Sequence, residues 1–314
     1  MKKLVCVGAC YLDTILDVPH YPSEDSKLRA TNLGVRRGGN CPNTLEVLQQ
    51  LLRERGDHHV KPYLISCLPS ADAPATATVV GSFGHESVVD FTRCIYRADH
   101  TEPASSYIIR SEATGSRTLV NYNNLPEMTI DEFVAAANDV GDDAWYHFEG
   151  RIPETTLQCI RYLRQLFPKT RVSVEVEKPG RSGLEDLAAE ADVVFYSRSW
   201  AESKRYQNAQ QCLSAQSGVA RRASLLCCTW GSDGASCLSL PSEEAVSLPA
   251  TLPGQTISVV DTVGAGDTFI AGMLFGLLCH HEDWDTEKKV QFAVQLATRK
   301  VQQDGFDGVG AGVM

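Results

Sequence analysis

The chain has 314 residues, 43% hydrophobic and 22% charged, a composition typical of globular proteins. Its formal charge of −10 argues against nucleic acid or an anionic membrane as the main partner. No apolar run approaches the roughly 20 residues of a membrane span, and Asp13 and Asp17 interrupt the first apolar stretch, so no signal peptide is apparent. The 11 cysteines include no Cys-x-x-Cys pair, which predicts reduced thiols and a cytoplasmic location.

The predicted elements alternate between strands and helices along most of the chain. Residues 3–9 read as a buried first strand, and residues 43–52 as a helix with Pro42 near its first turn. A helix is expected at 155–167, and strands at 171–177, 192–196 and 223–229. Strands separated by helices predict an α/β fold, a doubly wound and mostly parallel sheet flanked by helices.

Three stretches depart from this alternation. Residues 13–35 and 105–121 are polar, rich in turns and strand-like, which predicts a small separate sheet over the edge of the main sheet. Residues 53–78 carry charges and then a run of Ala, Thr and Pro, and we interpret them as a surface insertion. We expect one domain over residues 1–314, with lid strands drawn from about 13–35 and 105–124.

The strongest motif is Asp261-Thr-Val-Gly264-Ala265-Gly266-Asp267-Thr-Phe, directly before the apolar segment 270–278. It predicts a glycine-rich turn at the N-terminus of a buried helix, where free N–H groups and the helix dipole favour an anion. The glycines would let a phosphate approach the backbone closely. A carboxylate there would repel a phosphate, so Asp267 is best explained as a base that deprotonates the attacking nucleophile.

A second motif, Arg36-Arg37-Gly38-Gly39-Asn40-Cys41-Pro42-Asn43, places two amides at a predicted helix start. Amide donors and acceptors suit the hydroxyl groups of a polyol, although a plain turn with an N-cap is the alternative. Asp13 follows the first strand, where ligands of open α/β sheets bind. Asp13 and Asp25 could each hold hydroxyls or be solvated loop carboxylates.

Taken together and in this order, these elements resemble the ribokinase-like sugar kinases, also called PfkB carbohydrate kinases. The resemblance extends from Val5 to Gly308. Four segments are most similar to the ketohexokinase branch of the family, residues 21–29, 148–151, 172–179 and 305–308, and Val-Ser-Val-Glu-Val-Glu-Lys-Pro179 is the most specific of them. The resemblance implies ATP-dependent phosphorylation of a sugar hydroxyl, with fructose to fructose 1-phosphate as the expected reaction.

The resemblance also implies roles for individual residues. Asp267 would be the base, and the N–H groups of Gly264, Ala265 and Gly266 would stabilise the transferring phosphoryl group. The sugar would contact Asp13, Asp25, Gly39, Asn40, Asn43 and Asp267. The nucleotide would contact Arg117 from the lid, the loop Gly231-Ser232-Asp233-Gly234, and the same helix start at residues 264–266. The expected cofactors are ATP and Mg²⁺, with K⁺ left open, and a homodimer through the lid strands is implied.

The metal ligands stay unassigned. The family's Asn-x-x-Glu element is replaced by Ser197-Arg-Ser-Trp200. Glu175 and Glu177 share one face of a predicted strand, so either they hold Mg²⁺ through water or a salt bridge relieves their repulsion. Glu149 and Arg151 could face the same cleft, and Asp261 is either structural or part of a monovalent-cation loop. The region 84–96 is shorter than the family pattern by about three helical turns.

Other functions remain open at this point. A dinucleotide-binding dehydrogenase is disfavoured because Phe269 stands at the third glycine position of its motif. A kinase for ribose, a nucleoside or another ketose, and a family member that binds sugar or nucleotide without catalysis, are the remaining alternatives.

Overall fold

An eight-stranded sheet forms the centre of the computed structural model, which describes residues 1–56, 59–252, 254 and 256–313. Its strand order is β14-β13-β12-β11-β10-β9-β1-β4, parallel from β4 through β12 and antiparallel at β13 and β14. The strands are β1 (Lys2–Val7), β4 (Val60–Ile65), β9 (Ala144–Phe148), β10 (Arg171–Val176), β11 (Val193–Tyr196), β12 (Leu225–Thr229), β13 (Ala235–Ser239) and β14 (Ala245–Leu248).

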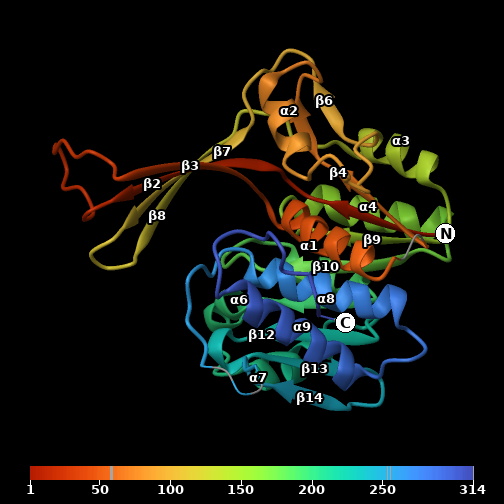
Figure 1. Cartoon of the computed structure of the whole chain (residues 1–314). Coiled ribbons are helices and arrows are strands. Elements are labelled where there is room, and N and C mark those ends of the chain that lie inside the picture. The colour runs from red at the N-terminus through yellow and green to blue at the C-terminus, as the bar shows by residue number, and fades with distance from the viewer. Residues whose placement is uncertain (57–58, 253, 255, 314) are drawn as a thin grey trace.

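Helices cover both faces of this sheet (Figure 1). One face packs against α1 (Asn40–Glu54), α2 (Pro74–Gly81), α8 (Ala265–Cys279) and α9 (Thr286–Lys300). The other packs against α3 (Ile130–Val140), α4 (Pro153–Leu166), α5 (Leu184–Glu190), α6 (Arg198–Ser203) and α7 (Ala209–Gln216). Successive strand residues serve opposite faces, as Leu4 and Val5 do in β1. The predicted doubly wound fold is therefore confirmed.

The alternation in β10 explains why its polar residues reach a functional face. Val172, Val174 and Val176 are fully buried in the core on the side of α4 and α5. Ser173 and Glu175, on the opposite face, point to the side of α1 and α8. The strand therefore contributes apolar packing on one face and buried polar groups on the other.

A four-stranded sheet projects from the main body as an arm, at the left of Figure 1. Its order is β3-β2-β7-β8, with β2 (Tyr11–Val18), β3 (Asn32–Gly38), β7 (Ala104–Ser111) and β8 (Arg117–Tyr122). Strands β2 and β7 pair in parallel, and β3 and β8 flank them antiparallel. These are the two stretches that the sequence singled out, so the small separate sheet is confirmed.

The interpretation of residues 53–78 as a surface insertion is wrong. Apart from residues 57–58, which lie outside the described part, this stretch finishes α1 and then forms β4, β5 (Cys67–Pro69) and the start of α2. Strand β4 pairs with β1 in register, Lys2 opposite Val60, and Leu64 and Ile65 are fully buried. The consecutive residues Lys61, Pro62 and Tyr63 concealed this strand in the sequence. An edge strand such as β4 tolerates polar residues and proline.

The stretch after α2 closes the core beside α1. Residues 82–94, all described, contain turns and one isolated bridge, and β6 (Ile95–Arg97) follows and pairs with β5. Phe83, Val89 and Cys94 are buried in the core beside α1, and Phe83 meets Phe91 edge to face with ring centroids 5.1 Å apart. Aromatic and aliphatic side chains therefore fill the core here without a helix between α2 and β6.

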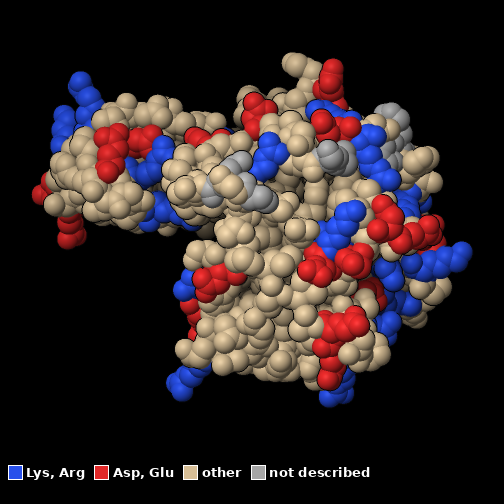
Figure 2. All heavy atoms as spheres, turned by 60° about the horizontal axis from the view of Figure 1, so that its bottom comes forward, with Lys and Arg blue, Asp and Glu red and all other residues tan. Residues whose placement is uncertain are grey.

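The described helices contain none with the length and apolar character needed to cross a membrane. Acidic and basic side chains are interspersed over the face shown in Figure 2, which carries no extended area of one sign. This face therefore shows no broad basic surface of the kind that attracts polyanions.

Candidate active site

A cleft of about 630 Å³ lies between the carboxyl ends of the central strands, the starts of α1 and α8, and the underside of the small sheet. Its lining includes Asp13, Gly39, Asn40, Asn43, Arg117, Glu149, Arg151, Glu175, Glu177, Thr229, Gly264, Gly266 and Asp267. A volume of this size suits small-molecule ligands, and the carboxyl edge of an open α/β sheet is where such ligands bind.

The start of α8 is held in a conformation that only glycine adopts readily. Gly264 has φ of +76°, and a Cβ there would lie 2.2 Å from the ring of Phe306. The preceding loop is anchored by Asp261, whose carboxylate accepts bonds from the buried Lys300 Nζ at 2.7 Å and the Val263 N–H at 2.9 Å. The backbone at the start of α8 is therefore fixed beside the cleft, which Gly264 and Gly266 line, while the Ala265 N–H donates to the Thr262 carbonyl at 3.3 Å.

Asp267 lies in the first turn of α8 and is only 8% exposed. Asn43 Nδ2 donates to Asp267 Oδ2 at 2.7 Å, and Arg37 Nη1 donates to Asn43 Oδ1 at 3.0 Å. Burial and, next, the charge of Glu175 raise the pKa of Asp267 well above its usual range. A raised pKa makes a carboxylate a stronger base, which is the property required of a residue that accepts a proton at neutral pH.

Asn40, at the start of α1, is held by two carboxylates of the neighbouring strand. Its Nδ2 donates to Glu175 Oε2 at 2.7 Å and to Glu177 Oε2 at 2.9 Å. Gly39 precedes it with φ of +105°, and a Cβ there would lie 2.2 Å from the carbonyl oxygen of Ala9. The Gly-Gly-Asn turn therefore packs closely against the backbone that follows β1, and Asn40 lines the cleft.

Glutamates gather beneath the cleft. Burial, followed by repulsion from Glu177, raises the pKa of Glu175 to about 8. Burial, followed by repulsion from Glu175, raises the pKa of Glu149 to about 7, and burial lowers the pKa of His147 to about 3. In the described residues, Glu175 and Glu177 bond to Asn40 and His147 rather than to a lysine or arginine, so the predicted salt bridge does not form.

The small sheet faces the cleft with one side. Residues that pair directly across neighbouring strands lie on the same face of a sheet. Asp13 of β2, Ser106 of β7 and Asn121 of β8 are paired in this way, and all three line the cleft. Burial raises the pKa of Asp13, while a bond from Ser106 opposes that shift. Arg117, at the start of β8, also lines the cleft. A carboxylate and a guanidinium thus come from the same face of this sheet.

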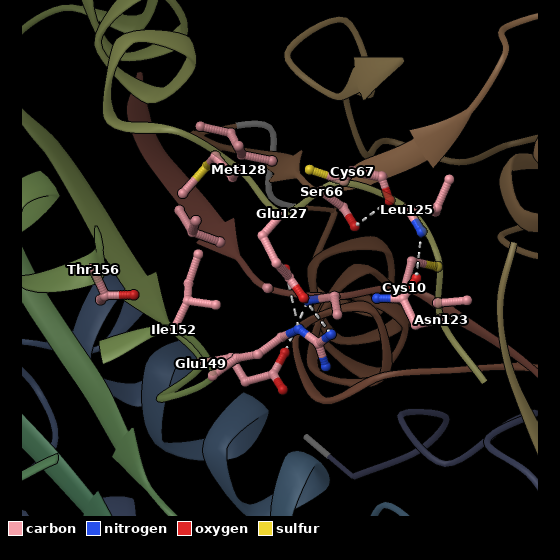
Figure 3. A pocket seen from close by; sticks show the side chains of 16 residues that line it. Cys10, Ser66, Cys67, Asn123, Leu125, Glu127, Met128, Glu149, Ile152 and Thr156 are labelled. Carbon is pink, nitrogen blue, oxygen red and sulfur yellow. Dashed lines mark hydrogen bonds and ion pairs between the residues drawn. The ribbon is translucent and has the colours of Figure 1, made fainter. Parts of the chain in front are cut away.

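A second cavity of about 40 Å³ lies behind Glu149 and Arg151, which line both spaces. In Figure 3, Glu127 reaches into this pocket from above, and Glu149 lies below it. Arg151 Nη2 donates to Glu127 Oε1 at 2.6 Å, and Arg151 also bonds to the Tyr11 hydroxyl. The space suits about one water molecule and no sugar, so these contacts serve to orient Arg151 at the edge of the main cleft.

Comparison with known proteins decides the family. Residues 1–308 match the pfkB family of carbohydrate kinases. The chain belongs to this family. It is 30% identical over 321 residues to ketohexokinase from Mus musculus, covering 98% of this chain and 99% of that protein. It is also 27% identical over 206 residues to a fructokinase from Rhizobium leguminosarum bv. trifolii, covering 61% and 59% of the two chains.

The fold of the family is also visible in solved structures. Ribokinase from Giardia lamblia superposes with a TM-score of 0.77 at 15% identity, covering 98% of this chain and 95% of that one. As a PfkB carbohydrate kinase, the chain is a phosphotransferase that acts on sugar hydroxyls, with sugar and ATP as its small-molecule partners. The dehydrogenase alternative is thereby excluded.

Most of the residues that the family resemblance pointed to come together in the cleft. Asp13, Gly39, Asn40, Asn43, Arg117, Gly264, Gly266 and Asp267 all line it, and Ala265 lies between two lining residues. Asp25 does not: it is exposed in the connection between β2 and β3, with φ of +59°, and is absent from the lining. The assignment of Asp25 to a sugar site formed by this chain alone is therefore corrected.

The loop after β12 lies beside the cleft rather than in it. Gly231–Asp233 form a single 3₁₀ turn, followed by Gly234 with φ of +83°. Gly231, Ser232 and Asp233 are exposed and are not part of the lining, whereas Thr229, at the end of β12, is. A nucleotide contact of residues 231–234 stays a prediction, because these residues lie outside the lining.

Two residues of the site escaped the sequence analysis. Arg37 was visible in the Arg-Arg-Gly-Gly-Asn motif, but nothing in the sequence indicated that it bonds to Asn43. His147 precedes Glu149 by two residues, so a strand pattern would have placed both on one face. Its contact with Glu175 depends on the pairing of β9 with β10, which spacing within one strand does not reveal.

Proposed function

We propose that the chain phosphorylates fructose at the 1-hydroxyl with ATP as donor. The observation that supports this most directly is the position of Asp267. Its carboxylate lies at an anion-binding helix start and bonds to Asn43, so it adjoins both a phosphate position and a hydroxyl-binding position. The names of the two curated relatives, a ketohexokinase and a fructokinase, favour fructose among the sugars.

In the proposed reaction, the sugar lies among Asp13, Gly39, Asn40 and Asn43. Asp267 takes the proton from the 1-hydroxyl as its oxygen forms a bond to the γ-phosphorus. The bond from that phosphorus to the bridging oxygen breaks, and ADP leaves with the electron pair. The N–H groups at residues 264–266 stabilise the charge on the transferring phosphoryl group.

The nucleotide would extend from this helix start past Thr229 toward the loop Gly231–Gly234, with Arg117 reaching its phosphates from the small sheet. A guanidinium suits this role because it is always charged and binds phosphate oxygens bidentately. The guanidinium of Arg198 lies over Trp230, 5.7 Å from the centroid of the tryptophan ring. An aromatic and a cationic group are therefore present next to this loop.

Mg²⁺ prefers oxygen ligands and retains several waters. Glu177 fits this preference because it is exposed and lines the cleft, and we propose that it meets the ion that accompanies ATP through water. When bound, the ion would neutralise phosphate charge. The carboxylate of Asp261 already pairs with Lys300 and Arg36, so we assign no potassium ligand to it.

We further propose that the small sheet closes over the sugar as a lid and pairs two subunits. Its outer face exposes Leu33, Val35, Tyr107, Val120 and Tyr122, and exposed apolar groups of this density suit a protein interface. A dimer in sedimentation experiments that becomes monomeric in Tyr107→Glu would support this arrangement. The cysteines form no disulfide bond in the described structure, which fits the cytoplasmic location that we propose.

The experiment that tests the proposed function is a panel of sugars and nucleosides with ATP and Mg²⁺, with and without K⁺. We expect phosphorylation of fructose, with phosphorus-coupled NMR placing the phosphate on O1. A clear preference for ribose or a nucleoside would move the assignment to another acceptor. No ADP release with any acceptor, together with retained sugar binding, would favour the non-catalytic alternative.

A further inference from the structure

Three side chains of metal-binding type meet beneath the cleft floor. Cys41 from α1, His147 from β9 and Glu175 from β10 each offer one ligand atom, and these atoms lie within 4.8 Å of one another. All three residues are buried, at 0%, 0% and 3% exposure. No step of the proposed phosphoryl transfer uses Cys41 or His147.

The ligand types distinguish this cluster from a magnesium site. A thiolate, an imidazole and a carboxylate are the ligands that Zn²⁺ takes in proteins, commonly with a water in the fourth position. Mg²⁺ demands oxygen ligands in octahedral geometry, so neither the thiol nor the imidazole suits it. The cluster is therefore separate in chemistry from the ion that accompanies ATP.

The imidazole is already oriented as a metal ligand would be. His147 Nε2 faces Glu175 Oε1 at 2.9 Å, and His147 Nδ1 meets Ser173 Oγ at 2.9 Å. Ser173 Oγ in turn accepts from Trp145 Nε1 at 2.8 Å. A partner on the remote ring nitrogen is the usual support of a metal-bound histidine, because it fixes the ring orientation and the tautomer.

The surrounding charge also favours a cation. Glu177 shares the amide of Asn40 with Glu175, and Asp267 and Glu149 line the same cleft. The nearby carboxylates attract a divalent cation to this position. Once the ion is bound to one thiolate and one carboxylate, the complex has no net charge, so its burial costs little free energy. Glu175 lines the cleft and gives an ion a path from solvent.

We propose that Cys41, His147 and Glu175 form a binding site for a zinc-type divalent cation, completed by a water from the cleft. On binding, the Cys41 S–H bond breaks and a sulfur–metal bond forms, and Glu175 gives up the proton that it shares with His147 Nε2, so two protons leave to solvent. The Glu175 oxygen then turns from His147 to the ion.

A consequence for the sugar site follows, and this part rests on the proposed function. Glu175 Oε2 holds Asn40 Nδ2 at 2.7 Å, so an ion that draws on the same carboxylate displaces Asn40 from its position in the cleft. Metal and sugar should therefore weaken each other's binding by the same factor. Zn²⁺ is expected to inhibit phosphorylation in competition with the sugar.

The test uses Co²⁺ as a probe, titrated into the metal-free full chain without nucleotide. Co²⁺ bound to a thiolate gives a sulfur-to-cobalt charge-transfer band, and four-coordinate Co²⁺ gives intense visible bands. We expect one equivalent to produce both, Zn²⁺ to abolish them, and Mg²⁺ to leave them unchanged. Cys41→Ser should lose the charge-transfer band, and Glu175→Gln should weaken Co²⁺ binding about tenfold or more.

The matched control is Cys227→Ser. Cys227 also lines the cleft, and its Sγ lies 3.1 Å from the Sγ of Cys237, so this pair is a competing thiol site that an ion could reach from the cleft. The signal should persist in that variant. Loss of the band in Cys227→Ser, its retention in a folded Cys41→Ser, or no thiolate band in the unaltered protein would each overturn the proposed site.

The coupling to sugar is measured separately, by repeating the Co²⁺ titration with saturating fructose. A several-fold weaker Co²⁺ affinity is expected, and Zn²⁺ inhibition should disappear in Cys41→Ser. A Co²⁺ site that is unaffected by sugar would overturn the coupling but not the site. Because the spectra require no turnover, failure of the proposed kinase function would not be mistaken for failure of the metal site.

Discussion

Asn43 holds Asp267 in place: its Nδ2 donates to Asp267 Oδ2 at 2.7 Å, while its Oδ1 accepts from Arg37 Nη1 at 3.0 Å. Arginine can only donate, so its contact fixes which end of the Asn43 amide faces Asp267. Oδ2 of Asp267 is thereby occupied, which leaves Oδ1 to receive a proton from a substrate hydroxyl. The orientation of the proposed base is set by a chain of three residues.

Replacing Asp267 by Asn should lower kcat by about 10²- to 10⁴-fold, the usual contribution of a general base. Sugar binding should persist, because an amide oxygen can still accept from Asn43. ADP release and equilibrium fructose binding measure the two effects. Asp131→Asn is the matched control, since Asp131 is a carboxylate in the first turn of α3, away from the cleft. An unchanged rate in the Asp267 variant would remove the assigned base.

Asn43→Ala removes both bonds of this residue and leaves buried Arg37 and Asp267 groups unpaired. An unpaired buried polar group costs about 1–3 kcal/mol, which corresponds to roughly a 5- to 150-fold loss. We therefore expect the KM for fructose to rise within that range, while the KM for ATP changes little. Initial-rate kinetics with each substrate varied give both values, and a selective effect on ATP would contradict the assignment.

The sequence predicted those strands whose local hydrophobic pattern matches their position in the assembled sheet. Apolar runs such as residues 3–9 and 223–229 become buried parallel strands because helices cover both faces of the sheet. Strand β4 was missed because its polar and proline residues fit an edge position, which only the assembled sheet defines. The small sheet was foreseen from strand-like stretches that lacked helices between them.

The sequence predicted those site residues that belong to short motifs of recognisable chemistry. Asp267 and Asn43 were singled out from two motifs more than 200 positions apart, and packing of α1 on α8 brings them together. The contacts of Arg37 and His147 could not be foreseen, because they depend on side-chain direction in three dimensions. Asp25 was predicted either to contact hydroxyls or to be a solvated loop carboxylate, and its exposed connection places it outside the cleft.

Arg37 should act as a positioning residue. It is 5% exposed, donates through Nε to Ser82 Oγ at 3.1 Å, pairs with Glu46, and lies over the ring of Phe83. Arg37→Lys keeps the positive charge but loses the planar guanidinium, which donates several hydrogen bonds at once. The fructose KM should therefore rise several-fold with little change in the pH profile. Arg37→Met removes the charge, which should raise the pKa of Asp267 and move the acid limb of kcat/KM to higher pH. Equal pH profiles in both variants would argue against this role.

Glu175 should influence the base through its charge. Repulsion from Glu175 raises the pKa of Asp267, second only to burial. Removing the charge in Glu175→Gln should lower the apparent pKa of the base, so the acid limb of kcat/KM moves to lower pH. Glu177→Gln is the control and should give a smaller shift, since its charge contributes less. An acid limb that stays in place in Glu175→Gln would contradict the coupling.

The same glutamates predict how stability depends on pH. The folded-state pKa values of Glu149 and Glu175, about 7 and about 8, lie above the value of 4.5 for free glutamate. The folded protein therefore binds more protons than the unfolded chain in this interval, so the free energy of unfolding should fall as pH rises from about 4.5 to about 8. Urea unfolding across this range should show the decline, and Glu149→Gln with Glu175→Gln should flatten it. A free energy that rises over this interval in the unaltered protein would contradict the assignment.

Lys300 should be needed both for the stability of the protein and for the position of residues 261–264, the loop before α8 that we call the phosphate loop. It is fully buried, and its Nζ donates to Asp261 Oδ2 at 2.7 Å and to the Asp261 carbonyl at 3.0 Å. Removing one partner of a buried pair typically costs 3–5 kcal/mol, and because Arg36 still contacts Asp261, we expect about 3 kcal/mol for Lys300→Met. Urea unfolding measures this loss, and kcat should fall because residues 261–264 lose their anchor.

The control for Lys300→Met lies on the same helix. Lys289 is also buried, but its Nζ donates to the Trp284 carbonyl, far along α9 from the phosphate loop. Lys289→Met should therefore affect stability without lowering kcat at a temperature where the protein stays folded. Adding Asp261→Asn to Lys300→Met should recover part of the lost stability, because it removes the buried charge left with a single partner. Equal kcat in the two lysine variants would show that the anchor does not act on the phosphate loop.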